Sequence, residues 1–330
     1  MSQPPRPLMA LADLATPMAI RVAATLGLVE HAGTGGATAA ELAGRTGAAA
    51  GPLRRLLDHL VTVEVFEVES GRYRPTALGA QMHPDAPEGV KPLLDITCAG
   101  GRAELAFVDL LDTVTTGAPA YPIRYGKQFW DDLGDSPKLR RSFEAQMNWR
   151  FREHAPRIAA NFDWSRFPTI VDVGGGDGPL LVEILSAHPT VRGQVVDLPP
   201  TAAAATARFA ALGIGDRAST VAGSFFDPLP AGADAYLLSD ILHDWDDEPC
   251  EKILTQVRDA CAPHSTVVLV EPVRGYGAAT DIDLFMLMCF NGRERTVDEL
   301  TSLAAGCGLT FQRAVPVSEG RMALELTLRG

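Results

Sequence analysis

The sequence predicts an α/β protein in which a parallel sheet covered by helices follows a smaller, mostly helical region. Two observations predict this fold class. From residue 168 onward, short apolar segments of strand length alternate with longer segments in which apolar residues recur at helical spacing. The strand segments are apolar almost without interruption, as in a parallel sheet covered on both faces. The length of 330 residues is comfortable for two domains.

The first 90 residues follow the pattern of a winged helix. Segments of helical spacing occupy residues 8–31, 38–47 and 51–61. The second segment begins with Thr38 and has Glu41 three residues later, which is the signature of a helix N-terminus. Residues 63–76 then alternate apolar and polar side chains about Ser70 and Gly71, a hairpin signature. We therefore expect a winged-helix-like domain over residues 1–90.

A winged helix raises the hypothesis of DNA binding, which the charges argue against. Residues 1–90 contain seven Arg and no Lys, against nine Asp and Glu. The candidate recognition helix offers Arg54 and Arg55 but also Asp58. A DNA-binding face needs a basic stripe, and the net charge of −12 also disfavours nucleic acids and anionic membranes. We expect neither partner and interpret the region as a dimerisation platform.

No segment of the sequence predicts a membrane span, a signal peptide or a zinc site. No apolar run reaches the roughly 18 residues of a membrane helix, and the N-terminus lacks the apolar core of a signal peptide. The five cysteines form no CxxC pair; they are Cys98, Cys250, Cys261, Cys289 and Cys307. We expect reduced thiols in a cytoplasmic protein.

The elements of the sheet can be placed in order along residues 91–330. A mostly helical stretch comes first, with a loop at 116–126 where Gly and Pro cluster. The expected strands lie within residues 168–173, 193–199, 219–226, 233–240 and 266–273. The expected helices between them lie within residues 179–189, 201–213 and 249–262. Ligands of such sheets bind beyond the carboxyl ends of the strands.

A glycine turn, DVGGGDG, connects the first of these strands to the first helix at residues 172–178. Glycines let the backbone approach a ligand closely, and Asp197 at the end of the next strand can bind both hydroxyls of a ribose. A nicotinamide dinucleotide is one candidate, but GxGxxG from Gly174 fails at Pro179. A nucleoside without phosphates, such as S-adenosylmethionine, suits the shorter turn better. A turn without a ligand is the third interpretation.

Two later segments, LSDILHDWDDE at 238–248 and NGRERT at 291–296, are far more specific than the glycines. With VDVGGGDG, VVDLP, AGSFFDPLP and LVEPV, they make the chain resemble the plant caffeate/chalcone-type O-methyltransferases and their bacterial relatives that tailor aromatic natural products. The resemblance covers nearly the whole chain. It implies a Rossmann-like, S-adenosylmethionine-dependent methyltransferase domain with a helical linker over 91–330, and a homodimer formed through residues 1–90.

The resemblance also implies which residues bind the methyl donor. Gly174 lies against it, Asp197 binds the ribose, and Trp245 packs on the adenine. The remaining carried-over positions are Arg140, Met147, Ser224, Phe225 and Ser239. Two of these depart from the plant pattern, because Ser224 replaces an Asp beside the adenine and Ser239 replaces a Lys, so both contacts must differ here.

Transfer of a methyl group to a phenol benefits from a base, because a phenol has a pKa near 10 and histidine one near 6.5. His243 follows the fourth strand and Glu271 ends the fifth. If those strands are neighbours, Glu271 can hold one ring nitrogen of His243, as a carboxylate does in a catalytic triad. The resemblance makes His243 the base, gives Glu271 that supporting role and places Glu294 beside them.

By resemblance, the acceptor pocket is lined by Phe143, Met147, Arg150, Phe285, Met286, Phe290 and Asn291. Methionine and phenylalanine suit a flat aromatic ring, so we expect a small aromatic substrate. Arg150 and Arg293 could favour a carboxylate on it. The simpler interpretation of residues 281–292 is an ordinary apolar helix face.

Several alternatives remain. His243 could be an idle polar residue, and Glu294 could form a surface ion pair with its arginine neighbours. Asp244, Asp246 and Asp247 could bind a metal ion, but they also read as the acidic first turn of a helix, and we expect no metal. Related proteins of this fold catalyse hydroxylation or decarboxylation. A ligand-sensing transcriptional regulator and an NAD-linked reductase are the alternatives from other classes.

Overall fold

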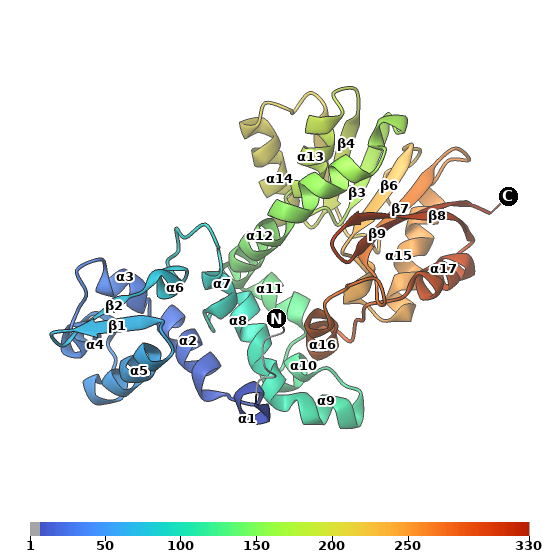
Figure 1. Ribbon diagram of the computed structural model, residues 1–330. Helices are drawn as coiled ribbons and strands as arrows, with labels where there is room; N and C mark the ends of the chain where they lie inside the picture. Colours follow the sequence, from blue (N-terminus) through green and yellow to red (C-terminus); the bar gives the residue numbers. More distant parts are fainter. Residues whose placement is uncertain (1–6, 330) are drawn as a thin grey trace, which may run out of the picture. The chain divides into compact units, whose positions relative to one another are not determined.

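The structure of the protein is a computed structural model that describes residues 7–329 (Figure 1). The chain divides into two compact units. The first unit comprises Met1–Leu105 and Asp132–Gln146, and the second comprises Ala106–Asp131 and Met147–Gly330.

The first unit contains the predicted helices and wing. The α-helices of its first segment, up to Leu105, are α1 (Leu8–Leu11), α2 (Ala15–Thr25), α3 (Leu28–Ala32), α4 (Ala39–Thr46), α5 (Ala50–Thr62), α6 (Ala77–Ala80), α7 (Lys91–Leu94) and α8 (Ala99–Glu104). Thr38 and Glu41 form the predicted capping box at the start of α4. The hairpin of β1 (Phe66–Glu69) and β2 (Arg72–Pro75) turns at Ser70 and Gly71, which both have positive φ.

One stretch of the first unit, Leu8–Thr25, is long and apolar enough to cross a membrane by those two criteria alone. That finding is weak, because core helices of other proteins pass the same test. Ala19, Ala23 and Ala24 on α2 are buried against the other helices of the unit. The stretch is also divided between α1 and α2.

The second unit is built on a seven-stranded sheet with the order β5-β4-β3-β6-β7-β9-β8. Its strands are β3 (Thr169–Val173), β4 (Arg192–Asp197), β5 (Ala218–Ala222), β6 (Ala235–Ser239), β7 (Thr266–Pro272), β8 (Leu309–Ser318) and β9 (Arg321–Leu328). The first five in chain order pair in parallel, as predicted. The strand order changes direction on the two sides of β3, which makes its carboxyl end the switch point where ligands bind.

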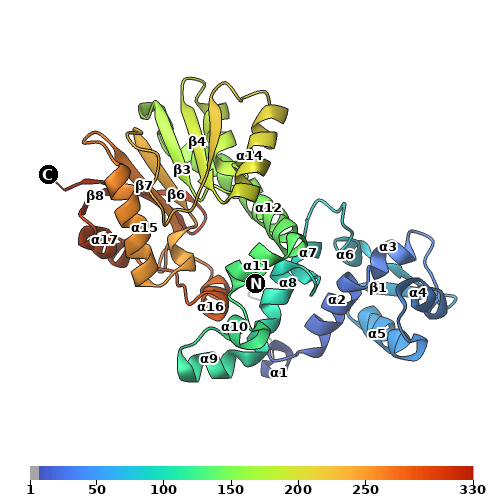
Figure 2. The same cartoon turned by 180° about the vertical axis from the view of Figure 1, so that it is seen from behind.

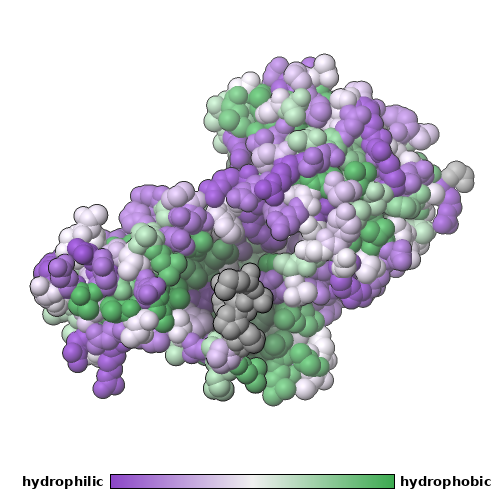
Figure 3. Space-filling view, in the orientation of Figure 1, coloured by the Kyte–Doolittle hydropathy of each residue, from purple (hydrophilic) through white to green (hydrophobic). Residues whose placement is uncertain are grey.

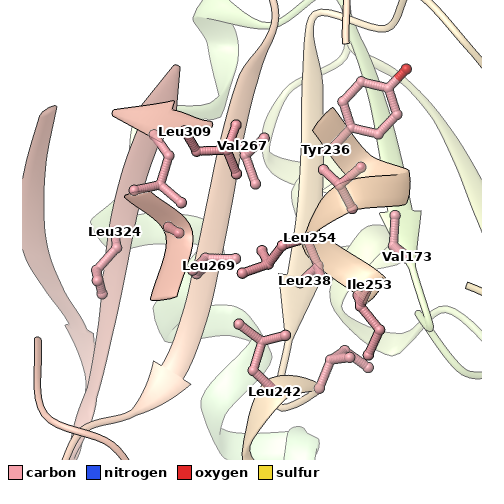
Figure 4. Packing of buried hydrophobic residues seen from close by; sticks show 14 of the residues in the cluster. Val173, Tyr236, Leu238, Leu242, Ile253, Leu254, Val267, Leu269, Leu309 and Leu324 are labelled. Atoms are coloured by element: carbon pink, nitrogen blue, oxygen red, sulfur yellow. The ribbon is translucent and has the colours of Figure 1, made fainter. Parts of the chain in front are cut away.

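Both faces of this sheet are covered (Figures 1 and 2). Side chains of α13 (Pro179–Ala187) and α14 (Pro199–Ala211) pack on one face, together with the second half of α12 (Pro137–Asn161). On the other face lie α15 (Asp247–Ala260) and α17 (Val297–Gly306). Figure 4 shows this second core, in which Leu238 and Leu269 of neighbouring strands meet Leu254 of α15.

Two expectations need correction. The sequence patterns gave no sign of β8 and β9, which extend the parallel sheet with an antiparallel hairpin, and β9 lies between β7 and β8. The loop expected at 116–126 contains a helix, α10 (Ala120–Tyr125), because only Gly117 to Pro119 interrupt the helical backbone after α9 (Leu110–Thr116).

The space-filling view shows an apolar patch over α9 on the second unit (Figure 3). Val108, Leu111, Val114 and Ile123 are all more than half exposed in this region. Adjacent exposed apolar side chains of this size are typical of interaction surfaces.

Candidate functional site

The glycine turn lies at the carboxyl end of β3, where the backbone takes conformations that only glycine adopts easily. Gly174, Gly176 and Gly178 all have positive φ. A Cβ atom on Gly174 would also stand 2.6 Å from the side chain of Ile241. The Gly176 amide donates to a carboxylate oxygen of Asp197 over 2.9 Å. The turn and the predicted ribose-binding acid are therefore adjacent.

A polar network that the sequence patterns did not reveal holds the same turn from outside. Asp177 Oδ2 accepts a hydrogen bond from Asn148 over 3.0 Å and one from Arg208 over 2.9 Å. Arg208 also donates to the amide oxygen of Asn148 over 2.7 Å. The three residues come from α12, the turn and α14, so they fix the turn to both helices.

An aromatic cluster lies around the predicted adenine platform. The ring of Trp245 meets Phe225 and Phe226 edge to face, with centroids 6.1 and 5.1 Å away. Trp130, which no motif indicated, stacks on Trp245 at 6.4 Å and on Phe290 at 5.4 Å. Flat apolar surfaces of this kind suit an aromatic ligand.

The imidazole of His243 is 5% exposed and lies just beyond β6, in a short helical turn over Leu242–Asp244. Its Nδ1 atom lies 3.1 Å from Oε1 of Glu294. Its Nε2 atom lies 3.5 Å from Oδ1 of Asp244, which is too long for a good hydrogen bond. Nε2 is therefore the nitrogen that could receive a proton from a ligand.

We expected Glu271 to bind one ring nitrogen of His243, but Glu294 is the residue at Nδ1. The strands β6 and β7 are neighbours as supposed, but Oε1 of Glu271 accepts from the backbone amides of Ile241 and Leu242, over 3.0 and 2.8 Å. These bonds fix the turn that carries His243. Oε2 of Glu271 is buried and has no hydrogen-bond partner among residues 7–329.

The segments HDWDD and NGRERT are attached to each other. The buried Arg295 donates to the carbonyl oxygens of Leu242 and Trp245, over 2.8 Å in both cases, and pairs with Asp247 at 2.7 Å. Arg293 also binds Asp247, at 3.0 Å. The acidic residues after Trp245 open α15, as predicted, and Asp247 additionally anchors the second segment.

Burial and neighbouring charges shift the pKa values of three groups in this site. Burial alone lowers the pKa of His243, but Asp244, the bond to Glu294 and more distant carboxylates raise it to about 10. Burial raises the pKa of Glu271 to about 7 and that of Asp244 to about 6, against the opposing effect of His243. The neighbouring carboxylates therefore favour the imidazolium form of His243 at neutral pH.

Asp240 directly follows β6, and its carboxylate is paired with an arginine. Arg321 of β9 binds both of its carboxylate oxygens, over 2.6 and 3.1 Å, and Arg150 lies 4.0 Å away. Burial raises the pKa of Asp240, but Arg321 outweighs it and holds the pKa well below the usual range. Arg321 also contacts His154, at 3.2 Å.

The other residues expected in the site are distributed between the two units. Arg140 and Phe143 lie on α12 within the first unit, whereas Met147 and Arg150 lie on the same helix within the second. The hydroxyl of Ser224 accepts a hydrogen bond from the Phe226 amide over 3.2 Å.

The remaining acceptor candidates belong to α16 (Thr280–Cys289) and the residues after it. The ring of Phe285 lies 6.2 Å from that of Phe290, and Met286 is buried. Asn291 has positive φ and contacts Asp246. Arg293 is 45% exposed and pairs with Asp247 at 3.0 Å.

Among the described residues, no group of three or more His, Cys, Asp or Glu side chains is arranged to bind a metal ion. The hydroxyl of Ser239 is buried and has no partner in the described part of the chain. Ser239 ends β6, the strand that pairs with β3, so it lies beside the glycine turn. Its hydroxyl can donate a hydrogen bond to a ligand there or accept one from it.

Comparison with known proteins identifies the family. The O-methyltransferase domain family matches residues 107–310, and the O-methyltransferase dimerisation domain family matches residues 9–85. The 2,7-dihydroxy-5-methyl-1-naphthoate 7-O-methyltransferase of Streptomyces carzinostaticus is 47% identical over 94% of both chains. Aclacinomycin 10-hydroxylase RdmB of Streptomyces purpurascens is 42% identical over 91% of this chain and 83% of its own.

A solved structure of the O-methyltransferase NcsB1 from neocarzinostatin biosynthesis is also similar. It was determined in complex with S-adenosylmethionine and 2-hydroxy-5-methyl naphthoic acid. It superposes with a TM-score of 0.92 at 46% identity, covering 99% of this chain and 100% of NcsB1. The expected fold and resemblance are thus confirmed, and the chain belongs to the S-adenosylmethionine-dependent O-methyltransferases that carry an N-terminal dimerisation domain.

Proposed function

We propose that the chain methylates a phenolic hydroxyl of a small aromatic acceptor in the tailoring of a bacterial secondary metabolite, with His243 as general base. The observation that carries the proposal is the orientation of His243: Nδ1 is bound by Glu294, while Nε2 is left for an acceptor. The relatives named above support the class of acceptor, since one acts on a dihydroxynaphthoate.

The donor fits the residues present at the switch point. Asp197 would bind the ribose, Gly174 would allow close approach, and the rings of Trp245 and Phe225 would cover the adenine. The orphaned hydroxyl of Ser239 offers a further contact. When bound, S-adenosylmethionine supplies an electrophilic methyl group on a positively charged sulfur.

The chain itself orients the acceptor molecule and provides the group that accepts its proton. Nε2 of His243 takes the phenolic proton, so the acceptor oxygen can attack as an oxyanion. Glu294 then stabilises the imidazolium at Nδ1, and Glu271 keeps the turn in place through Ile241 and Leu242. We further propose that Phe143, Met147, Arg150, Phe285, Met286, Phe290 and Asn291 line the acceptor pocket, and that Arg140 contacts the donor.

We also propose that the protein is a cytoplasmic homodimer, joined mainly through a dimerisation domain at residues 1–90, with residues 91–330 forming the catalytic part. The exposed apolar side chains Leu8, Met9, Leu11 and Leu14 support this, as does the match to a dimerisation domain family.

The proposal is tested with a His243→Ala protein and a panel of hydroxynaphthoates and hydroxybenzoates. We expect the wild type to add one methyl group, detected by mass, and the variant to lose about 10² to 10⁴ in rate while retaining its affinity for S-adenosylhomocysteine. Full turnover by the variant would remove the base assignment. A wild type that binds no S-adenosylhomocysteine at micromolar concentrations would contradict the donor.

Hydroxylation is the second candidate reaction, and it is supported by the 42% identity to aclacinomycin 10-hydroxylase. The same mass measurement separates the two reactions, because hydroxylation adds an oxygen atom and methylation adds a carbon and two hydrogens. The presence of a buried His243 next to Glu294 favours methylation.

A further inference from the structure

The imidazole of His243 is surrounded by more negative charge than a general base needs. Asp240 and Asp244 belong to its own segment, Glu271 ends β7, and Glu294 lies in the 291–296 segment. All four carboxylates contribute to the electrostatics of the ring, and each side chain is at most 15% exposed. They reach the ring from three separate parts of the chain.

The cations that face these acids do not balance them. Arg321 is buried and bound to Asp240, and Arg150 lies 4.0 Å from the same carboxylate. Arg295 is occupied by Asp247 and by backbone carbonyl oxygens. Four carboxyl groups thus face two guanidinium groups and the imidazolium, which leaves one negative charge over when all four are ionised. Because the pKa of Glu271 is about 7, this surplus is fully present only above pH 7.

Two buried carboxylate oxygens near the imidazole lack a partner for their negative charge. Oε2 of Glu271 and Oε2 of Glu294 are both inaccessible to solvent, and neither has a hydrogen-bond partner in the described part of the chain. The side chains are 1% and 2% exposed. Buried carboxylate oxygens without partners are costly and indicate that a positively charged or proton-donating group completes the site.

This inference rests on the proposed function, which identifies the positively charged group as the sulfonium of the methyl donor. In an in-line transfer, the sulfur, the methyl carbon, the acceptor oxygen and Nε2 of His243 come in succession. A reacting distance of about 3 to 3.5 Å and a hydrogen bond of about 3 Å place the donor methyl group roughly 6 Å from the imidazole. We propose that binding of the sulfonium donor expels the proton of His243, so that the base is created only when the donor is in place.

The driving force is repulsion between two cations in one buried site. At this distance, with an effective dielectric constant near 20, a sulfonium lowers the pKa of an imidazolium by about two units. The carboxylates that raise the pKa of His243 to about 10 keep the ring charged without the donor. The same carboxylates then stabilise the sulfonium once the proton has gone. The product, S-adenosylhomocysteine, has a neutral sulfur and exerts no such effect.

The proton that leaves is the one on Nε2, because Nε2 must be vacant to receive the phenolic proton while Nδ1 keeps its proton on Glu294. Oδ1 of Asp244 lies 3.5 Å from Nε2, and the Asp244 side chain is 15% exposed. The proton can therefore pass by way of Asp244 to water before the acceptor occupies Nε2.

The test is calorimetry of the full-length protein at pH 8.5 in two buffers with different ionisation enthalpies, phosphate and Tris. We expect S-adenosylmethionine to release roughly half a proton or more per site, and S-adenosylhomocysteine to release none. His243→Gln should abolish the release. His264→Gln is the matched control, because His264 is 61% exposed and pairs only with Asp234 among the described residues.

A second measurement needs no variant. The affinity for S-adenosylmethionine should rise with pH between 7 and 9, by up to about tenfold per unit, relative to that for S-adenosylhomocysteine. Equal proton release by both ligands, an unchanged affinity ratio, or release that persists in His243→Gln would overturn the inference. If neither ligand bound, the proposed function itself would fail, which is a distinguishable outcome.

Discussion

Gly292 lies directly against the backbone of His243. A Cβ atom on Gly292 would stand 2.1 Å from the carbonyl oxygen of His243 and 2.7 Å from the carbonyl carbon of Asp244. The two segments can approach this closely only because residue 292 has no side chain. That approach brings Glu294, two residues later, to Nδ1 of His243.

Gly292→Ala is therefore expected to separate the two segments. We expect a loss of about 1 to 3 kcal/mol in the free energy of unfolding, and a fall in kcat of at least about tenfold, because Glu294 is displaced. Gly306→Ala is the control, since a Cβ atom there would meet nothing within 4 Å. Thermal unfolding and kcat would be measured for both. A variant with normal kcat would show that the contact does not position Glu294.

The pH dependence of catalysis should report the carboxylates around His243. The proposed base is the neutral form of His243, and the surrounding carboxylates raise the pKa of this residue to about 10. The value of kcat/KM for the donor should therefore rise with pH from 7 toward 10, since this quantity reports the free enzyme.

Glu294→Gln should move that rising limb to lower pH, because the substitution removes a carboxylate that stabilises the imidazolium. The plateau should also fall, since the amide stabilises the protonated ring less well. Glu248→Gln serves as control, because Glu248 is exposed and pairs with Lys252 on the surface of α15. A rising limb at the same pH in Glu294→Gln would rule out this role for the carboxylate.

The features that the sequence predicted correctly are those set by neighbouring residues. The capping box of Thr38 and Glu41, and the hairpin turn at Ser70 and Gly71, each depend on a few consecutive positions. The strands β3, β6 and β7 were recognisable for the same reason, because each is a nearly continuous apolar run. The helix at Ala120–Tyr125 was predicted as part of a loop, because Pro119 precedes it and Gly126 follows it.

The parts that could not be predicted depend on how distant segments meet. The choice between Glu271 and Glu294 as partner of Nδ1 depends on the path of residues 291–296, which Arg295 and Gly292 determine. Arg321 reaches Asp240 only because β9 enters the sheet beside β7, and no local pattern encodes that insertion. Trp130 belongs to no motif, yet it stacks on Trp245.

Asp172 should make stability depend on pH. Burial and, to a smaller extent, Asp197 raise its pKa to about 7, against about 4 in the unfolded chain. Between these values the unfolded state holds fewer protons than the folded state, so stability falls as pH rises from 4 to 7. Above pH 7 the full cost of the buried charge is present.

Asp172→Asn removes this charge and should raise the free energy of unfolding at pH 8 by on the order of 2 kcal/mol. The gain should shrink toward zero near pH 4, because Asp172 is then neutral in both states. Chemical unfolding at several pH values would measure it, with the exposed Asp216→Asn as control. A gain that does not change with pH would mean that Asp172 does not titrate in this range.

The network of Asn148, Asp177 and Arg208 should control affinity for the donor without touching the reacting atoms. Arg208 donates both to Asp177, at 2.9 Å, and to Asn148, at 2.7 Å. Asp177 lies within the glycine turn, between Gly176, whose amide binds Asp197, and Gly178. Loss of the guanidinium removes the hydrogen bonds that join α14 to Asp177 of the turn and to Asn148 of α12.

We therefore expect Arg208→Met to weaken binding of S-adenosylhomocysteine by about five- to twentyfold, which corresponds to about 1 to 2 kcal/mol for a hydrogen-bonded charged group. The effect on kcat at saturating donor should be small, because His243 and Glu294 belong to other segments. Arg192→Met is a matched control, since Arg192 is exposed and donates to the Asp216 carbonyl oxygen, away from the turn. Asp177→Asn in the Arg208→Met background should add little further loss, because residues in one network do not contribute independently. Equal donor affinity in Arg208→Met and Arg192→Met would show that the turn keeps its shape without this network.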